Sequence, residues 1–212
     1  MIDKAPEWKN TKTQVFWGEI APSDHVVQVY ENEEVFLNSL EMYIQGGLKA
    51  DNCNIVIATA NHLESLRYRL IQHGYVIDEL CTDDRLILLN AEDILSKFMV
   101  NNWPDEVLFK ETILNVIARA RRKNRDVRAF GEMVALLWAQ GHNGATVQLE
   151  NLWNKFCETE ALCLFCAYPK VGFTQNPAAS IHNICCTHTK MVGGWDKSKT
   201  EIYYKDTLQI VK

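Results

Sequence analysis

Short apolar runs alternate along the chain with longer stretches in which apolar residues recur every three or four positions. Five runs rich in aliphatic residues predict buried strands, at 25–30, 54–59, 85–89, 127–130 and 162–168. The intervening stretches have helical spacing, over 36–44, 63–71, 104–120, 132–140 and 144–158, and a further helix is expected after Asn90. A short helix near 178–189 and a polar, hairpin-like tail at 201–211 complete the predicted elements.

Turn and capping residues set the expected ends of the helices. Gly46-Gly47 is expected to stop the first helix, and Gly74 the second. Asn90 is placed to cap the helix that follows the third strand. Pro104, a residue favoured in the first turn, is expected to open the next one.

This regular alternation predicts an α/β fold, a mainly parallel sheet of about five strands with helices on both faces. We expect an N-terminal extension at 1–19, one main domain at 20–190 and a tail at 191–212 that adds a hairpin or edge strand.

Composition narrows the class of protein. The 212 residues carry a formal net charge of −5, which argues against generic nucleic-acid binding. No window approaches the length of a membrane span, and the polar N-terminus lacks the apolar core of a signal peptide. We therefore expect a cytoplasmic protein whose seven cysteines are mostly free thiols.

Ligands of parallel α/β sheets bind beyond the carboxyl ends of the strands, and that rule selects the candidate ligand-binding residues. They are Tyr30, Glu31, Thr59, His62, Glu132, Met133, Trp138 and Tyr168. Glu132 lies in a mostly apolar run, so we expect a paired carboxylate or one with a raised pKa. It is placed to accept a proton, to bind a polar ligand group, or only to cap the following helix.

The first strand-to-helix turn lacks the chemistry of a phosphate loop. It reads Tyr30-Glu31-Asn32-Glu33-Glu34, with three carboxylates and no glycine, and they would repel a triphosphate. No Ser-His-Asp order or nucleophile elbow is present either. We therefore expect no enzymatic activity and no cofactor.

The cysteines give one alternative that involves a metal. Cys163 and Cys166 lie three apart in a predicted strand and point to opposite faces, so they cannot share a metal and are expected to be buried thiols. The run 182–188 looks more like a zinc site, but its apolar stripe favours packing. No metal is expected, and the alternative ligand set is His182, Cys185, Cys186 and His188.

Four segments resemble one known family. Residues 130–138, which read FGEMVALLW, are similar to the signature of the MEDS family, a methanogen/methylotroph sensory domain of the dichloromethane-regulator type. The segments 25–33, 149–154 and 164–169 agree in the same order, so the similarity covers about residues 20–190.

The resemblance implies a fold related to the RecA/KaiC class of ATPases without the phosphate loop. It also implies a sensory, signal-transducing domain that binds a small, hydrocarbon-like ligand and acts through a partner such as a histidine kinase or transcriptional regulator. The alternatives are a degenerate nucleotide-binding protein or a protein-interaction module, for which the basic residues at 119–128 are one surface. Direct nucleic-acid or membrane binding is not expected, and homo-oligomerisation stays open.

Overall fold

The structure, a computed structural model, describes residues 8–14, 17, 20–172, 184, 188–196 and 199–205. Its strands are β1 (Trp8–Gln14), β2 (His25–Tyr30), β3 (Cys53–Ala58), β4 (Leu86–Asn90), β5 (Met99–Val100), β6 (Trp103–Pro104), β7 (Val127–Gly131), β8 (Cys163–Pro169), β9 (Lys190–Asp196) and β10 (Lys199–Lys205). Its α-helices are α1 (Glu33–Lys49), α2 (Ala60–Gln72), α3 (Ile77–Thr82), α4 (Ala91–Leu95), α5 (Glu106–Ala120), α6 (Met133–Ala139) and α7 (Asn143–Glu160). A 3-10 turn, Lys170–Gly172, follows β8.

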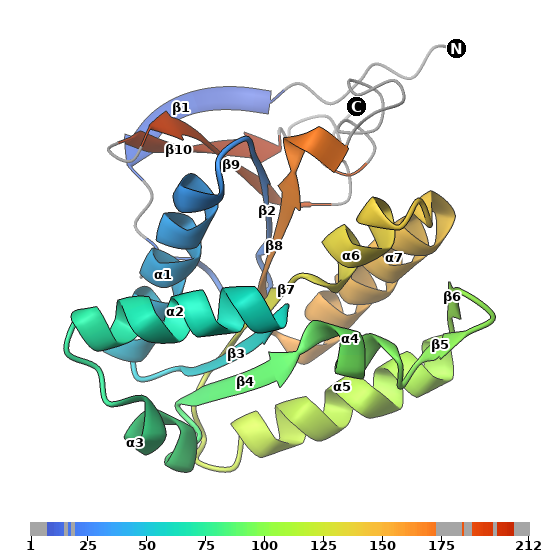
Figure 1. Cartoon of the computed structure of the whole chain (residues 1–212), viewed down its shortest axis with the longest axis horizontal. Coiled ribbons are helices and arrows are strands. Elements are labelled where there is room, and N and C mark those ends of the chain that lie inside the picture. Colours follow the sequence, from blue (N-terminus) through green and yellow to red (C-terminus); the bar gives the residue numbers. More distant parts are fainter. Residues whose placement is uncertain are drawn as a thin grey trace, which may run out of the picture.

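One large sheet organises the chain. Its strand order is β1-β10-β9-β2-β8-β7-β3-β4, and the six strands from β9 to β4 run parallel to one another. β10 and β1 extend the sheet antiparallel beyond β9 (Figure 1). The predicted α/β class with a mainly parallel sheet is confirmed. The expected relation to the RecA/KaiC class stays a prediction.

Helices cover both faces of this sheet (Figure 1). On one face, α1, α2 and α3 pack over strand residues such as Val56, Phe130 and Phe165. On the other face, α4, α5, α6 and α7 pack over residues such as Ile57 and Cys166. Alternate residues of each strand serve opposite cores, because both faces of a parallel sheet are buried.

The first helix continues past the glycines that were expected to stop it. α1 ends at Lys49, so a helix end at Gly46-Gly47 is wrong. A Cβ at position 47 would lie 2.0 Å from the Asn54 side-chain oxygen and 3.1 Å from Cδ of Arg128. Gly47 therefore lets α1 approach the sheet closely and does not end the helix.

The start of α5 also differs from the expectation. Pro104 belongs to β6, and the helix begins at Glu106 with Asp105 as its N-cap. The Asp105 carboxylate accepts hydrogen bonds from the backbone N–H groups of Val107 and Leu108, at 3.0 and 2.9 Å. A charged N-cap at this position outweighs the first-turn preference of proline.

Several cations of the basic run after α5 are paired within the chain. Arg121 binds Glu160, and Arg125 binds Asp83 at 2.8 Å. Arg128 is buried, and its Nε donates to Asn52 at 2.8 Å. These contacts leave less positive charge for a partner than the sequence suggests.

The thiols of β8 point to opposite faces, as predicted. Cys163 packs with the core under α1, whereas Cys166 packs with the core under α7. Among the described parts of the chain, no helix is both long and apolar enough to cross a membrane.

Candidate functional site

Glu132 forms the centre of a polar cluster at the carboxyl ends of β3 and β7. Its backbone N–H bonds to the carbonyl of Ile57 at 2.9 Å, which fixes it at the end of the sheet. Its carboxylate accepts hydrogen bonds from the Thr59 backbone N–H at 2.8 Å and from His62 Nδ1 at 2.7 Å. Glu132 occupies the N-cap position of α6, but its side chain makes no capping hydrogen bond to that helix.

His62 bridges Glu132 to the first turn of α1. Its Nε2 lies 3.3 Å from the Glu33 carboxylate, on the side of the ring opposite Glu132. Burial lowers the pKa of His62, but hydrogen bonds and charges from Glu132 and Glu33 outweigh it, so the net pKa is raised. The cluster therefore favours an imidazolium held between two carboxylates.

Two aromatic rings, those of Tyr30 and Phe36, lie next to this ionic cluster. The Tyr30 ring stacks on Phe36 with centroids 4.8 Å apart and planes at 16°, and Phe36 meets His62 edge-on at 5.0 Å. Burial raises the pKa of Tyr30, and the charges of Glu132 and Glu33 raise it further, so its hydroxyl remains a neutral donor. Phe36 belongs to the helical pattern predicted over 36–44 and was not a candidate site residue, so its contact with His62 was not expected.

A surface groove borders the cluster between α1 and α2. Its volume is about 670 Å³, and its lining residues Glu34 and Asn61 are the chain neighbours of Glu33 and His62. The other lining residues are Leu37, Glu64, Ser65, Tyr68 and Arg69.

Four of the candidate residues thus lie together at this edge, namely Tyr30, Thr59, His62 and Glu132. Glu31 instead forms an exposed ion pair with Lys170, at the end of β8. Met133 is fully buried in the core under α7.

The other two candidate aromatic residues point away from Tyr30. Trp138 donates through Nε1 to the carbonyl of Gly172 at 2.8 Å. Tyr168 pairs with Val29 in the sheet and packs with the core under α7, whereas Tyr30 packs with the core under α1. Tyr30, Trp138 and Tyr168 therefore do not line one pocket, because the two tyrosines lie at neighbouring strand positions that face opposite sides of the sheet.

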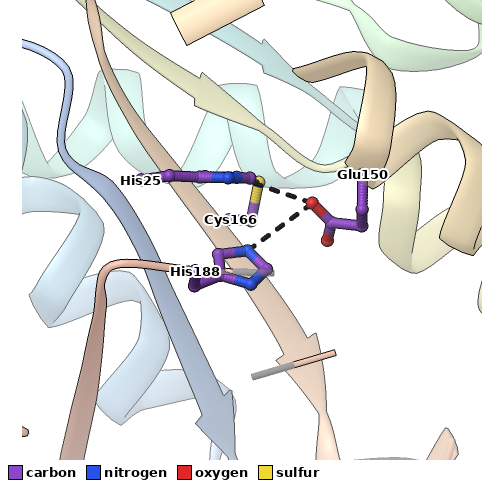
Figure 2. Close-up of side chains that lie close together, drawn as sticks. All are labelled: His25, Glu150, Cys166 and His188. Atoms are coloured by element: carbon purple, nitrogen blue, oxygen red, sulfur yellow. Dashed lines mark hydrogen bonds and ion pairs between the residues drawn. The ribbon is translucent and has the colours of Figure 1, made fainter. Parts of the chain in front are cut away.

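Tyr168 instead reaches a second polar cluster, which is buried between the sheet and α7. Its hydroxyl donates to Glu150, which lies beside His25, Cys166 and His188 (Figure 2). These four side chains point toward one another, and each is no more than 1% exposed. His25 and Glu150 were not among the candidate residues. The only sequence signal was a carboxylate between the apolar positions 149 and 152 of α7.

Burial dominates the titration of this cluster. It lowers the pKa of His25 to about 4, against the effect of the hydrogen bond that His25 makes to the Asn154 side chain. It raises the pKa of Glu150 to about 8, although the bond from Tyr168 opposes the shift. Of the alternative metal ligands, His188 lies in this cluster, while His182, Cys185 and Cys186 lie outside the described residues.

The parallel sheet and its two helical layers define an α/β domain. In such domains ligands bind beyond the carboxyl ends of the strands, which is where the Glu132 cluster lies. A model of the MEDS family, described as the methanogen/methylotroph, DcmR sensory domain, matches residues 24–189. The chain belongs to the MEDS family of sensory-type domains, because the match covers more than three quarters of its length. No curated protein matches the chain.

Proposed function

We propose that the chain is a non-enzymatic sensory domain that binds a small ligand beside the His62–Glu132 pair. The observation that carries this proposal is the pair itself, a 2.7 Å charged contact at the carboxyl ends of the central strands. Its side chains are only 13% and 8% exposed. Such a pair is costly to bury for packing alone, and polar groups of this kind converge in ligand sites.

The charges of the site favour a ligand with a hydrogen-bond donor. Glu132 and Glu33 share one imidazole, so the cluster keeps an excess of negative charge even when His62 is protonated. The stacked rings of Tyr30 and Phe36 supply an apolar surface next to these acceptors. A short alcohol or amine with a small hydrocarbon body matches this combination.

The same turn disfavours a phosphate ligand. The N-terminus of α1 is capped by Asn32, whose side chain accepts from the Glu34 N–H at 2.8 Å. A phosphate at this helix end would have to displace Asn32 and approach the Glu31, Glu33 and Glu34 carboxylates. These contacts support a role without nucleotide hydrolysis.

We propose that ligand binding is passed to a separate signalling protein, such as a histidine kinase or a transcriptional regulator. The groove between α1 and α2 is suited to this step, because both helices begin at the ion pairs of His62. A ligand that reorders these pairs changes the relative position of the two first turns.

The ligand is tested by thermal unfolding in the presence of methylamine, methanol and dichloromethane. A ligand at a hundred times its Kd stabilises the folded state by about 2.7 kcal/mol, roughly 5–10 °C in Tm for a chain of this size. The variant Glu132→Gln should lose the shift, whereas Glu92→Gln, an exposed carboxylate on α4, should keep it. If all three probes leave Tm unchanged, or if Glu132→Gln retains the full shift, this ligand site is refuted.

The signalling partner is tested by crosslinking in cells. Complexes trapped through a photoreactive residue at Tyr68, which is 65% exposed in the groove, should change in yield when the ligand is added. The same probe at Val147, 41% exposed on α7, is the control. Equal, ligand-independent yields at both positions would contradict output through the groove.

A further inference from the structure

Four potential metal ligands converge in the cluster between the sheet and α7. His25 comes from β2, Cys166 from β8 and Glu150 from α7, and His188 lies just before β9 (Figure 2). One donor atom of each lies within 4.8 Å of the others. His25 Nε2 is 3.4 Å from Cys166 Sγ and 3.5 Å from Glu150 Oε2, and His188 Nε2 is 3.5 Å from the same oxygen.

These three separations fall within the range of a tetrahedral coordination shell. Zinc bonds of about 2.0–2.3 Å place neighbouring ligand atoms about 3.3–3.8 Å apart. The two N···O separations of 3.5 Å are long for direct hydrogen bonds, which are about 2.7–3.2 Å. The side chains are therefore spaced to share an ion at their centre.

Each imidazole is held with Nε2 directed into the cluster. His188 Nδ1 lies 2.7 Å from the backbone carbonyl of Ile184, which can only accept, so Nδ1 carries the proton. His25 Nδ1 likewise donates to Asn154 Oδ1 at 2.7 Å. Metal-binding histidines are oriented in this way by a hydrogen bond from the other ring nitrogen.

Glu150 presents one oxygen in the same direction. Its Oε1 accepts from Tyr168, whereas Oε2 is buried and accepts no hydrogen bond from any part of the chain that the structure describes. With both Nδ1 atoms protonated, the neutral imidazoles offer lone pairs to the same space. A cation at the centre of the cluster would bind the two imidazole nitrogens and the Glu150 oxygen together.

We propose that His25, Glu150, Cys166 and His188 bind one zinc ion. On binding, the Cys166 thiol loses its proton to solvent and the thiolate sulfur coordinates the metal. The charges of Zn²⁺, one thiolate and one carboxylate sum to zero, so the occupied site suits its buried position. This inference does not depend on the ligand site at His62, which lies under the opposite helical layer.

The site is structural in type. Four protein ligands complete a tetrahedral shell and leave no position for substrate or water. His25 on β2 lies near the start of the matched domain, and His188 lies near its end. The ion therefore holds the segment just before β9 against β2 and α7.

The proposal is tested by elemental analysis and cobalt substitution of the full chain. Protein purified without chelator should hold about one zinc per chain. The Co²⁺-loaded protein should show a thiolate-to-cobalt charge-transfer band and intense visible bands of a tetrahedral site. Less than a tenth of an equivalent of zinc in folded wild-type protein, with no such band on adding Co²⁺, would overturn the proposal.

Matched variants locate the ligands. Cys166→Ala should lose the charge-transfer band and at least nine tenths of the metal, whereas Cys163→Ala, on the same strand but facing the other core, should retain both. Glu150→Gln should weaken zinc binding at least tenfold and Glu158→Gln on the same helix should not. If Cys166→Ala does not fold, alkylation of wild-type protein decides: Cys166 should become modified only after chelation.

Cys185 and Cys186, which lie close to His188 in the sequence, are the alternative zinc ligands that the test must exclude. Metal content retained by Cys185→Ser/Cys186→Ser supports the four-residue site. Metal lost from that variant but retained by Cys166→Ala would assign the ion to the run 182–188 and overturn the proposal.

Discussion

Replacing Gly47 by alanine tests how closely α1 packs on the sheet. The new Cβ would lie 2.0 Å from Asn54 Oδ1 and 2.9 Å from its Cγ, so the amide has to move. The Asn54 side chain is fully buried, and its Nδ2 donates to the carbonyls of Asn52 and Arg85 at 3.1 and 3.3 Å. The substitution therefore combines overpacking with the loss of buried hydrogen bonds.

The expected cost follows from these contacts. Overpacking costs about 1–3 kcal/mol and an unsatisfied buried amide about 1–3 kcal/mol, while alanine returns about 1 kcal/mol of helix propensity. The net destabilisation is about 1–5 kcal/mol, and the middle of that range lowers Tm by roughly 6–12 °C. Urea unfolding followed by circular dichroism measures the free energy directly.

Gly46→Ala is the matched control, because Gly46 lies one residue earlier in the same helix and is half-buried. It should gain up to about 1 kcal/mol from helix propensity. If Gly47→Ala is as stable as wild type, or if the two variants shift together, the close approach of α1 to the sheet is refuted.

Three further substitutions test other contacts. Because the pKa of His62 is raised above 6.5 by Glu132 and Glu33, its stabilising contribution is full below about pH 6.5 and is lost as pH rises through the folded-state pKa. The stability difference between wild type and His62→Gln in urea should therefore shrink at alkaline pH, and a difference that grows would contradict this. Asp105→Ala should lose about 1 kcal/mol as the cap of α5 is removed, and thermal unfolding without any change would exclude that cap. Leu149→Ala, at a fully buried position of α7, should cost about 2–5 kcal/mol, and calorimetry showing under 1 kcal/mol would mean that α7 does not pack as described.

Hydrophobic periodicity was sufficient to predict the layers of this fold. The runs at 25–30, 54–59 and 127–130 are strands within one residue of their predicted ends, because buried parallel strands are apolar on both faces. Helix ends were harder to predict at Gly47 and Pro104. At Gly47 the helix continues despite the glycine, because α1 packs closely against β3. At Pro104 the helix starts two residues later than expected, because Asp105 caps it.

The polar cluster around Glu132 was predicted in part. The rule for strand carboxyl ends selected Glu132, His62, Thr59 and Tyr30, and the structure brings these four together. It also selected Tyr168, which belongs to the other face. Residue alternation within β2 and β8 is local, but the register Val29–Tyr168 that separates the two rings is set between strands far apart in the chain.

The α/β class, the family and the lack of a phosphate loop could be recognised in the sequence, because these depend on local periodicity and on short motifs. Which side chains share a site became clear from the three-dimensional arrangement. His25, Glu150, Cys166 and His188 are separated by up to 163 positions, and the order β9-β2-β8 brings three of them together beneath α7. No local pattern encodes that meeting, since it arises from strand order and helix packing.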